Sequence, residues 1–167
     1  LNWLDQKLAG LTAIEKVIAK YDLAIISVLL DAGAGQTWGY TEPETQLMFT
    51  RSEGLAVASY QMFCQGIFSS DSNNSLKVDA RKLQNLTKEE LAMGFQITPD
   101  NPLVGLDGRL KLLQKLGQVL YSLPDIFGKE NPRPGNLVNY LLKRVENNKL
   151  AATTVFNAVL QGLSDIW

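Results

Sequence analysis

The sequence predicts an all-α protein: one helical bundle over residues 1–167 that leaves room for a small β-hairpin near residues 38–50. Three observations favour this fold class. Apolar residues recur at intervals of three and four along most of the chain, which is the spacing of amphipathic helices. Two segments, Thr50–Glu53 and Thr87–Glu90, have the pattern of a helical capping box. The chain has no internal repeat, low-complexity segment or clear interior boundary, so its 167 residues fit a single domain.

The N-terminal part contains two predicted helices. The first carries apolar residues at helical spacing from Leu4 to Ile18. Asp22 is a suitable N-cap for a second helix, Leu23–Ala32, and Gly33 is a suitable C-terminal cap. This second helix is apolar nearly all round, so we expect it to be central and buried. Its β-prone Ile-Ile-Ser-Val sequence leaves a strand as the alternative for residues 23–30.

The middle of the chain combines a hairpin with two capped helices. Residues 41–50 are polar except for the apolar residues 47–49, which form the second arm of the predicted hairpin. The capping box at Thr50 opens a helix that Gly66 ends, and the box at Thr87 opens a short helix that Gly94 ends.

The C-terminal part is again helical. Pro99–Pro102 breaks the chain, because each proline forces its predecessor out of helical geometry. An amphipathic helix follows at residues 106–123, and a rigid turn is expected at Pro132–Gly135. Apolar residues at helical spacing then predict two last helices, at residues 137–145 and 155–163.

The composition excludes several classes of function. A net charge of −1 gives no support for nucleic-acid binding, which needs a basic surface. The longest apolar run, residues 23–30, is too short to span a membrane. The single cysteine, Cys64, cannot form an internal disulfide, which fits a reducing, cytoplasmic location. We interpret it as a small core residue.

The chain contains no histidine, which removes the commonest general base and metal ligand. A Ser-His-Asp or Cys-His nucleophile is therefore excluded within this chain, and a zinc site is not expected. We expect no cofactor and no metal. Any acid–base chemistry must come from Asp, Glu, Lys or Tyr side chains.

Asp31 is the first candidate catalytic residue. It lies at the end of an apolar helix, where the negative end of the helix dipole repels a carboxylate by about 0.3–1 kcal/mol. A glycine-rich segment and two aromatic residues, Trp38 and Tyr40, follow it, as in a pocket for a small polar ligand. A helix end followed by a buried tryptophan is the alternative. The Gly33–Gly35 segment is not a phosphate loop, because it follows a helix and has no lysine.

Other candidate binding residues lie in turns and at helix starts, and for each a purely structural role is the alternative. Arg51 and Ser52 open a helix, where backbone amides favour an anion. Arg133, between two prolines, can pair with a carboxylate or a phosphate. The remaining candidates are polar loop residues able to hydrogen-bond a ligand: Asp71, Gln96, Asp100 and Asn101.

Several of these segments together resemble one known family. The segments are Ser27–Gly35 with Trp38 and Tyr40, Arg51–Ser59, Phe68–Asp71, Gly94–Gln96, Pro99–Leu106, Gly108–Arg109 and Arg133–Gly135. In this order and spacing they are similar to the uracil catabolism protein 4 family, over about Leu23–Trp167. More distantly, the order of elements resembles queuosine-phosphate N-glycosylase, a helical relative of DNA glycosylases, in which a Leu-Val-Asp helix precedes an aromatic-rich loop.

The resemblance implies a DNA-glycosylase-like helical fold and a role in uracil or pyrimidine catabolism. It suggests metal-independent, N-glycosidase-like hydrolysis of a ribosyl-urea or ribosyl-pyrimidine intermediate. Asp31 would be the catalytic carboxylate, because such cleavage passes through an oxocarbenium-like state. Trp38 and Tyr40 would stack on the base or ureide, and Arg51, Ser52 or Arg133 would hold a phosphate. The expected partner is a small ribosyl or nucleotide ligand.

Members of that family are longer than this chain, and the region that resembles the catalytic-acid part of the glycosylase is absent here. We therefore expect residues 1–167 to be part of a longer family domain. The alternative function is a non-catalytic helical module that binds a ligand or assembles, by self-association or with a partner that supplies the missing half.

Overall fold

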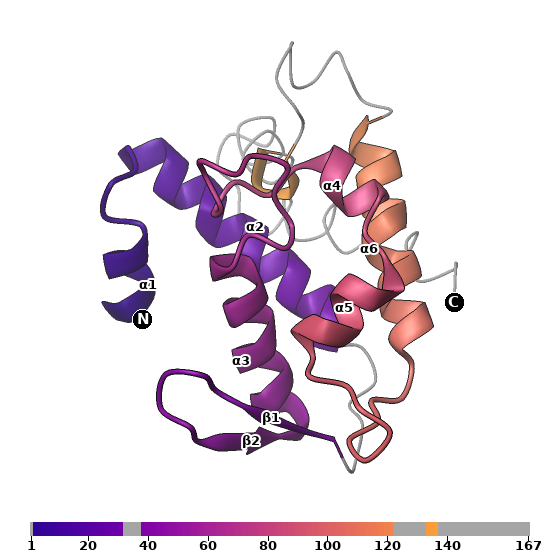
Figure 1. The fold of residues 1–167 in the computed structure, drawn as a ribbon. Coiled ribbons are helices and arrows are strands. Elements are labelled where there is room, and N and C mark those ends of the chain that lie inside the picture. The colour runs from indigo at the N-terminus through magenta and orange to yellow at the C-terminus, as the bar shows by residue number, and fades with distance from the viewer. Residues whose placement is uncertain (1, 32–37, 122–132, 137–167) are drawn as a thin grey trace, which may run out of the picture.

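The computed structural model describes residues 2–31, 38–121 and 133–136, which form a mostly helical structure with one small antiparallel sheet (Figure 1). The predictions of a mostly helical protein and of a hairpin near residues 38–50 are confirmed. The elements in chain order are α1 (Asn2–Lys7), α2 (Ala13–Asp31), β1 (Gly39–Thr41), β2 (Met48–Thr50), α3 (Arg51–Cys64), α4 (Ala80–Gln84), α5 (Lys88–Gly94) and α6 (Leu106–Tyr121).

The boundary between the first two helices differs from the prediction. The chain breaks before Ala13, and α2 then runs through Asp22 without interruption. Thr12 and Glu15 explain the break, because they form a reciprocal cap. The Thr12 amide donates to Glu15 Oε2 at 2.9 Å, and the Glu15 amide donates to Thr12 Oγ1 at 3.4 Å. Asp22 is therefore not an N-cap, and the strand alternative for residues 23–30 is wrong.

The hairpin leads directly into α3. In the sheet, Gly39 pairs with Thr50, Tyr40 with Phe49 and Thr41 with Met48. Thr50 is the N-cap of α3, but its side chain makes no capping hydrogen bond, so the predicted capping box here is wrong. The reason lies in the direct join of strand to helix: Arg51, the first helical residue, has a φ of 53°, which is not helical geometry.

The predicted start of α5 and the predicted end of α3 are confirmed, whereas Gly94 is the last helical residue of α5 and the C-cap is Phe95. Thr87 and Glu90 form the full capping box of α5. Gly66, with a φ of 77°, ends α3: the amides of Gly66 and Ile67 donate to the carbonyls of Phe63 and Met62. The short helix α4 was not predicted. Its N-cap is Asp79, whose carboxylate accepts from the Lys82 amide.

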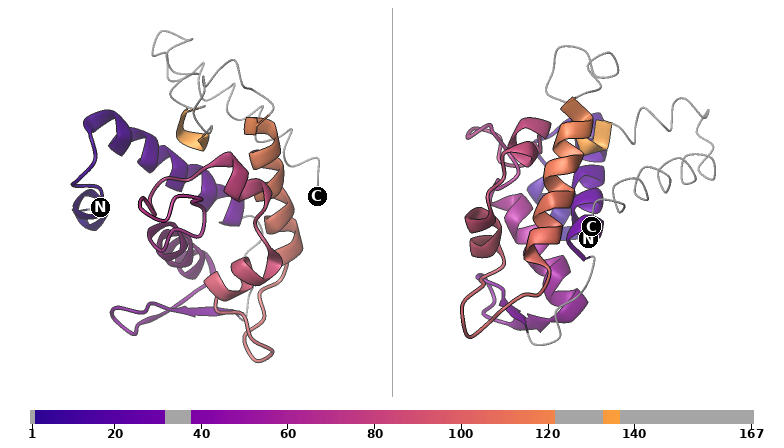
Figure 2. Two further views of the ribbon diagram at one scale, coloured as in Figure 1. Left: turned by 45° about the horizontal axis from the view of Figure 1, so that its top comes forward. Right: turned by 90° about the vertical axis from the view of Figure 1, so that its right-hand side faces the viewer.

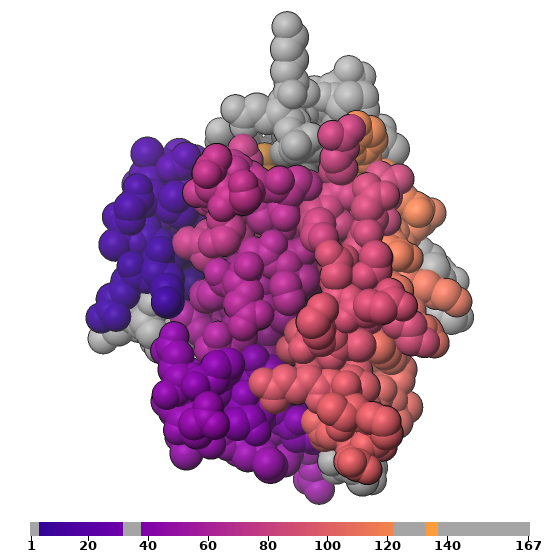
Figure 3. Space-filling model, viewed as in Figure 1, coloured from indigo at the N-terminus to yellow at the C-terminus, as the bar shows by residue number. Residues whose placement is uncertain are grey.

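The core lies where α2 packs against α3 and α6, while α4 and α5 pack along α6 (Figures 1 and 2). In the space-filling view, α1 and the start of α2 flank α3 on one side, and residues 80–121 flank it on the other (Figure 3). The predicted helix at residues 23–32 lies within α2, and its apolar residues Leu23, Ile26 and Leu30 are buried in the core, as expected. It is not buried on every side, because Val28 is 53% exposed.

Parts of the sequence-based prediction lie outside the described residues. These are the C-terminal cap at Gly33, the end of the helix at 106–123, and the two helices at 137–145 and 155–163. Within the described ranges, every helix is too short or too polar to cross a lipid bilayer.

We predict that Gly117→Ala destabilises the protein by about 1–3 kcal/mol. In an ordinary helix interior this change is stabilising by about 1 kcal/mol. Here α4 lies so close to α6 that a Cβ at residue 117 would come within 2.5 Å of the Gln84 amide nitrogen and 2.6 Å of the Ala80 carbonyl oxygen. Urea unfolding measures the effect. Gly10→Ala is the control, since a Cβ there meets nothing within 4 Å. A stabilised Gly117→Ala protein would contradict the prediction.

Candidate functional site

The structure divides the predicted site residues between the two ends of α3, which is 14 residues and about 21 Å long. Asp31 ends α2 at the same end of the molecule as β1, the start of α3 and the loop before α6 (Figure 1). We call this the Asp31 end. The predicted site residues found there are Asp31, Trp38, Tyr40, Arg51, Ser52, Gln96, Asp100 and Asn101. Asp71 and Arg133 lie at the opposite end.

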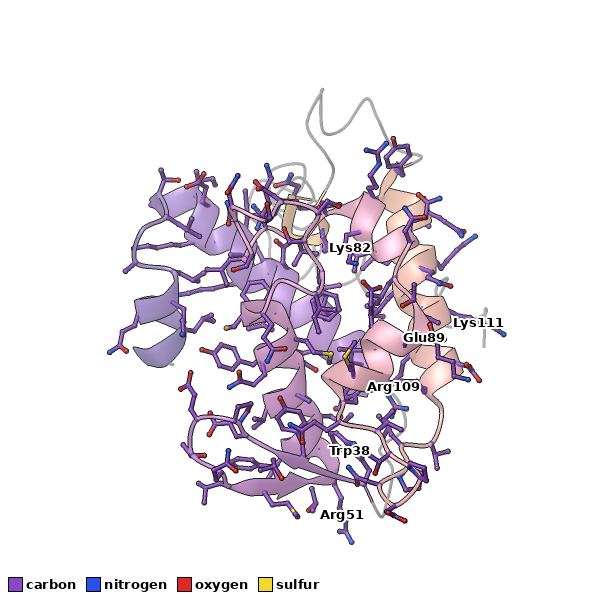
Figure 4. All side chains as sticks on the ribbon, viewed as in Figure 1. Trp38, Arg51, Lys82, Glu89, Arg109 and Lys111 are labelled. Atoms are coloured by element: carbon purple, nitrogen blue, oxygen red, sulfur yellow. The ribbon has the colours of Figure 1, made fainter. Side chains whose placement is uncertain are left out.

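Arg109 organises the Asp31 end. It is on the inner face of α6 and is completely buried (Figure 4). Its Nε donates to the Leu30 carbonyl at 2.7 Å, and its Nη1 donates to the Val104 carbonyl. The guanidinium thus binds the last turn of α2, where helix carbonyls carry partial negative charge. One side chain therefore joins α2, α6 and the loop between α5 and α6.

The Asp31 carboxylate is exposed and interacts electrostatically with this buried arginine. Burial lowers the pKa of Arg109 below its ordinary value, and the negative charge of Asp31 acts against that shift. Arg109 therefore explains how an acid is tolerated at the C-terminal end of α2: the guanidinium offsets both the helix dipole and the carboxylate. Because the Asp31 carboxylate is exposed, it can contact a ligand.

Trp38 and Tyr40 are core residues in this structure. Trp38 has an exposed fraction of zero, and its Nε1 donates to the Phe95 carbonyl at 2.9 Å. Its ring packs edge-on against Phe95, with centroids 5.6 Å apart, and lies 6.2 Å from the Tyr40 ring. Burial, followed by the charge of Glu42, raises the pKa of Tyr40. Both rings support the Asp31 end from inside, and their stacking on a ligand stays a prediction.

Gln96 and Asn101 bind the backbone of β1. Asn101 Oδ1 accepts from the Gly39 amide at 2.9 Å, and its Nδ2 donates to the Gly39 carbonyl at 2.8 Å. Gln96 does the same at Thr41, with distances of 3.0 and 2.8 Å. These side chains were predicted to bind an amide- or urea-like group. In this structure the amides that they bind are the protein's own peptide groups.

Three further candidates at the Asp31 end are exposed. Arg51 (Figure 4) and Ser52 form the first turn of α3. Asp100 lies in the turn between Thr98 and Asn101. Their side chains are available to solvent and to a ligand. Their role in binding stays a prediction.

Asp71 belongs to the loop at the other end of α3. Its Oδ1 accepts from the Asn73 amide at 2.9 Å, as in a local turn. The neighbouring Ser70 is bound through its amide and hydroxyl to the Asp79 carboxylate, at 2.7 and 3.0 Å. Asp71 is thus remote from Asp31, and the structure does not place the two in one site.

Arg133 forms a buried ion pair with Asp22. Its Nε and Nη2 lie 2.8 and 2.5 Å from Asp22 Oδ2, and the Gly135 amide donates to Oδ1 at 2.6 Å. Burial raises the pKa of Asp22 to about 7, although the Arg133 charge and the Gly135 amide act in the opposite direction. Arg133 is therefore committed to holding residues 133–136 on α2. A phosphate-binding role for it stays a prediction.

Sequence reasoning missed two of these anchors. Arg109 stands in the helical row Leu106, Arg109, Leu113, Leu116, so an arginine occupies a core position of an amphipathic helix. That pattern signals a buried cation with a partner. Asp22 similarly interrupts the apolar surface of α2. Among the described residues, no group of three potential metal ligands comes together.

The whole chain, residues 1–167, matches the family described as "Protein of unknown function (DUF1688)". The chain belongs to the DUF1688 family. The resemblance to the uracil catabolism protein 4 family is thereby confirmed, because a protein of that name matches closely. No solved structure matches the chain, so a DNA-glycosylase-like fold stays a prediction.

Two curated relatives of this DUF1688 chain are known by name. "Uracil catabolism protein 4" of Lachancea kluyveri is 48% identical over 164 residues, which are 95% of this chain and 37% of that protein. "Protein urg3" of Schizosaccharomyces pombe is 46% identical over 121 residues, 72% of this chain and 29% of that protein. The chain spans well under half the length of these relatives.

We predict that Asp22→Asn destabilises the protein by about 3–5 kcal/mol, because it leaves the Arg133 charge buried without its partner. The measurement is urea unfolding at about pH 8, above the pKa of Asp22, where the carboxylate is ionised. The Asp22→Leu/Arg133→Met double variant should recover much of the loss. Asp5→Asn is the control: it breaks the exposed pair with Lys20 and should leave the midpoint unchanged. A small loss of stability in Asp22→Asn would contradict the prediction. It would mean that residues 133–136 detach from α2 without destabilising the rest of the protein.

Proposed function

We propose that this chain is part of an enzyme of uracil catabolism that hydrolyses the bond between ribose and a urea- or pyrimidine-derived group. The name of the relative from Lachancea kluyveri supports a role in uracil catabolism. The exposed carboxylate of Asp31, at the end of α2 and within the electrostatic influence of the buried Arg109, supports the reaction and is the observation that carries the proposal.

The chemistry needs what Asp31 can offer. Cleavage of an N-glycosidic bond builds positive charge on the sugar ring, and a nearby carboxylate stabilises that charge or activates the attacking water. Neither role requires histidine, which the chain lacks. The leaving urea or base must receive a proton, and that acid is not assigned to any residue of this chain.

The surroundings of Asp31 would hold its backbone in place. Arg109 binds the Leu30 carbonyl, so the last turn of α2 cannot move without breaking a buried hydrogen bond. Arg51 and Ser52 open α3 at the same end and would supply a positive charge and a hydroxyl for a sugar phosphate. The proposed reaction needs a catalytic group and a separate group that binds the substrate. Asp31 would be the first, and Arg51 with Ser52 would be the second.

The test is release of urea or base from ribosylurea, its 5′-phosphate and uridine monophosphate. It uses this chain alone and a chimera in which the chain replaces the matched region of the Lachancea kluyveri protein. We predict that Asp31→Asn lowers turnover at least about a hundredfold. Glu53→Gln, another exposed acid near the start of α3, is the control and should leave turnover unchanged.

Two outcomes would count against this proposal. Undiminished turnover in Asp31→Asn removes Asp31 from the reaction. Absence of release by both the chain and the chimera removes the reaction itself. Unfolding midpoints of both variants show whether lost activity reflects lost structure, which we do not expect, since removing a negative charge at a helix C-terminus is not unfavourable to the dipole.

A second function, assembly, is favoured by the outer face of α2. Ile14, Val17 and Val28 are 51%, 41% and 53% exposed, and Tyr21 and Ala24 fall between them at intervals of three and four residues. Such a row forms one apolar stripe along a helix. We propose that this stripe packs against the part of the longer family protein that this chain does not span, since the relatives have ample further length.

Co-purification tests the assembly function. The part of the Lachancea kluyveri protein outside the matched region is expressed separately with a tag. We predict that this chain co-purifies with it and that Val17→Asp/Val28→Asp abolishes the association, because two buried unpaired charges would be required. Lys111→Asp, at an exposed position of α6, is the control. Failure to co-purify, or stable dimers of the chain alone that the same double variant disrupts, would reject this partner.

A further inference from the structure

A hollow of about 520 Å³ lies between α2, α3 and the segment that connects β1 to β2. None of the site residues predicted from the sequence lines it, and neither proposed function uses it. Ligand-binding pockets of proteins typically have volumes of about 300–1,000 Å³. The hollow is therefore large enough for a small organic molecule.

The walls of the hollow are apolar and aromatic. Leu23 of α2, Val57 of α3 and Leu47 of the hairpin supply aliphatic surface, and Phe49 and Tyr60 supply two rings. Leu47 is 59% exposed, so much of its apolar surface faces water. An occupant with an apolar body would cover these side chains and release water from them.

The charged groups of the hollow are all negative. Glu42 and Glu44 line it, and none of its lining residues, all within the described chain, is a lysine or arginine. Burial, followed by the contact with Cys64 and the charges of Glu44 and Glu42, raises the pKa of Tyr60. The Ser27 and Thr45 hydroxyls add acceptors beside them.

Glu42 retains capacity to bind a ligand. One of its oxygens accepts from Gln61 Nε2 at 3.4 Å and the other from the Thr45 hydroxyl. A carboxylate has about four acceptor positions, so at least one on each oxygen is left for another donor. The side chain is held by these bonds at the edge of the apolar walls.

From this arrangement we propose that the hollow between α2, α3 and the β1–β2 segment binds a small organic ammonium ion with an aliphatic or aromatic body. The body lies against Leu23, Leu47 and Val57. The ammonium group donates to the carboxylates of Glu42 and Glu44 and lies close to the Phe49 and Tyr60 rings, which line the hollow. Carboxylates together with aromatic faces are the groups that recognise organic cations.

The test is titration of the chain with 2-phenylethylammonium chloride, followed by NMR and calorimetry. We expect binding in the millimolar range, which suits so small a ligand. Glu42→Gln/Glu44→Gln should weaken binding at least about tenfold, since it removes the charge-assisted hydrogen bonds. The neutral analogue 2-phenylethanol should bind the unchanged chain about as weakly as the ammonium ion binds this double variant. Glu53→Gln, an acid on α3 outside the hollow, is the matched control and should bind as the unchanged chain does.

A second variant tests the location independently of charge. Ala56 lines the hollow from the exposed side of α3, so Ala56→Trp should fill the hollow without disturbing the core and should abolish binding. Absence of binding to the unchanged chain overturns the proposal. Equal affinity for the alcohol and the ammonium ion also overturns it, because the hollow would then be an apolar surface without cation recognition. Binding that survives Ala56→Trp places the ligand elsewhere.

Discussion

The contact between Arg109 and the end of α2 is the interaction on which the described structure depends most. It joins residues 79 positions apart in the sequence, and it does so with a charge that is completely buried. A buried guanidinium is tolerated only where acceptors surround it, and the Leu30 and Val104 carbonyls are such acceptors. These bonds fix the relative positions of α2, α6 and the preceding loop. The backbone at the end of α2, which carries Asp31, gains a defined place as a consequence.

Local signals in the sequence were enough for much of the fold. The Thr87 capping box, the Gly66 helix end and the hairpin each depend on residues within a few positions of one another. The boundary between α1 and α2 was also readable, because Thr12 and Glu15 have capping-box spacing. The capping box predicted at Thr50 does not form, because the chain passes directly from β2 into α3 and Arg51 has a positive φ. That geometry is set by the sheet and has no local sequence mark.

The candidate site was less predictable, because polar side chains have several possible partners and only the fold selects one. Asn101 and Gln96 have amides suited to a ligand, yet they bind β1. Arg133 is suited to a phosphate, yet it binds Asp22. Asp31 is exposed, and the nearby Arg109 guanidinium donates to the Leu30 and Val104 carbonyls. The candidate residues therefore separate into those that build the Asp31 end and those that remain open to solvent there.

The side-chain amides of Asn101 and Gln96 affect whether another protein chain can pair with the edge of β1. A strand at the border of a sheet offers unpaired amides and carbonyls on which another chain can grow. In β1 these groups belong to Gly39 and Thr41, and Asn101 and Gln96 occupy all four. The two side chains take the place of a third strand. The sheet is thereby closed to extension on that border, which protects a short, exposed hairpin from aggregation by strand addition.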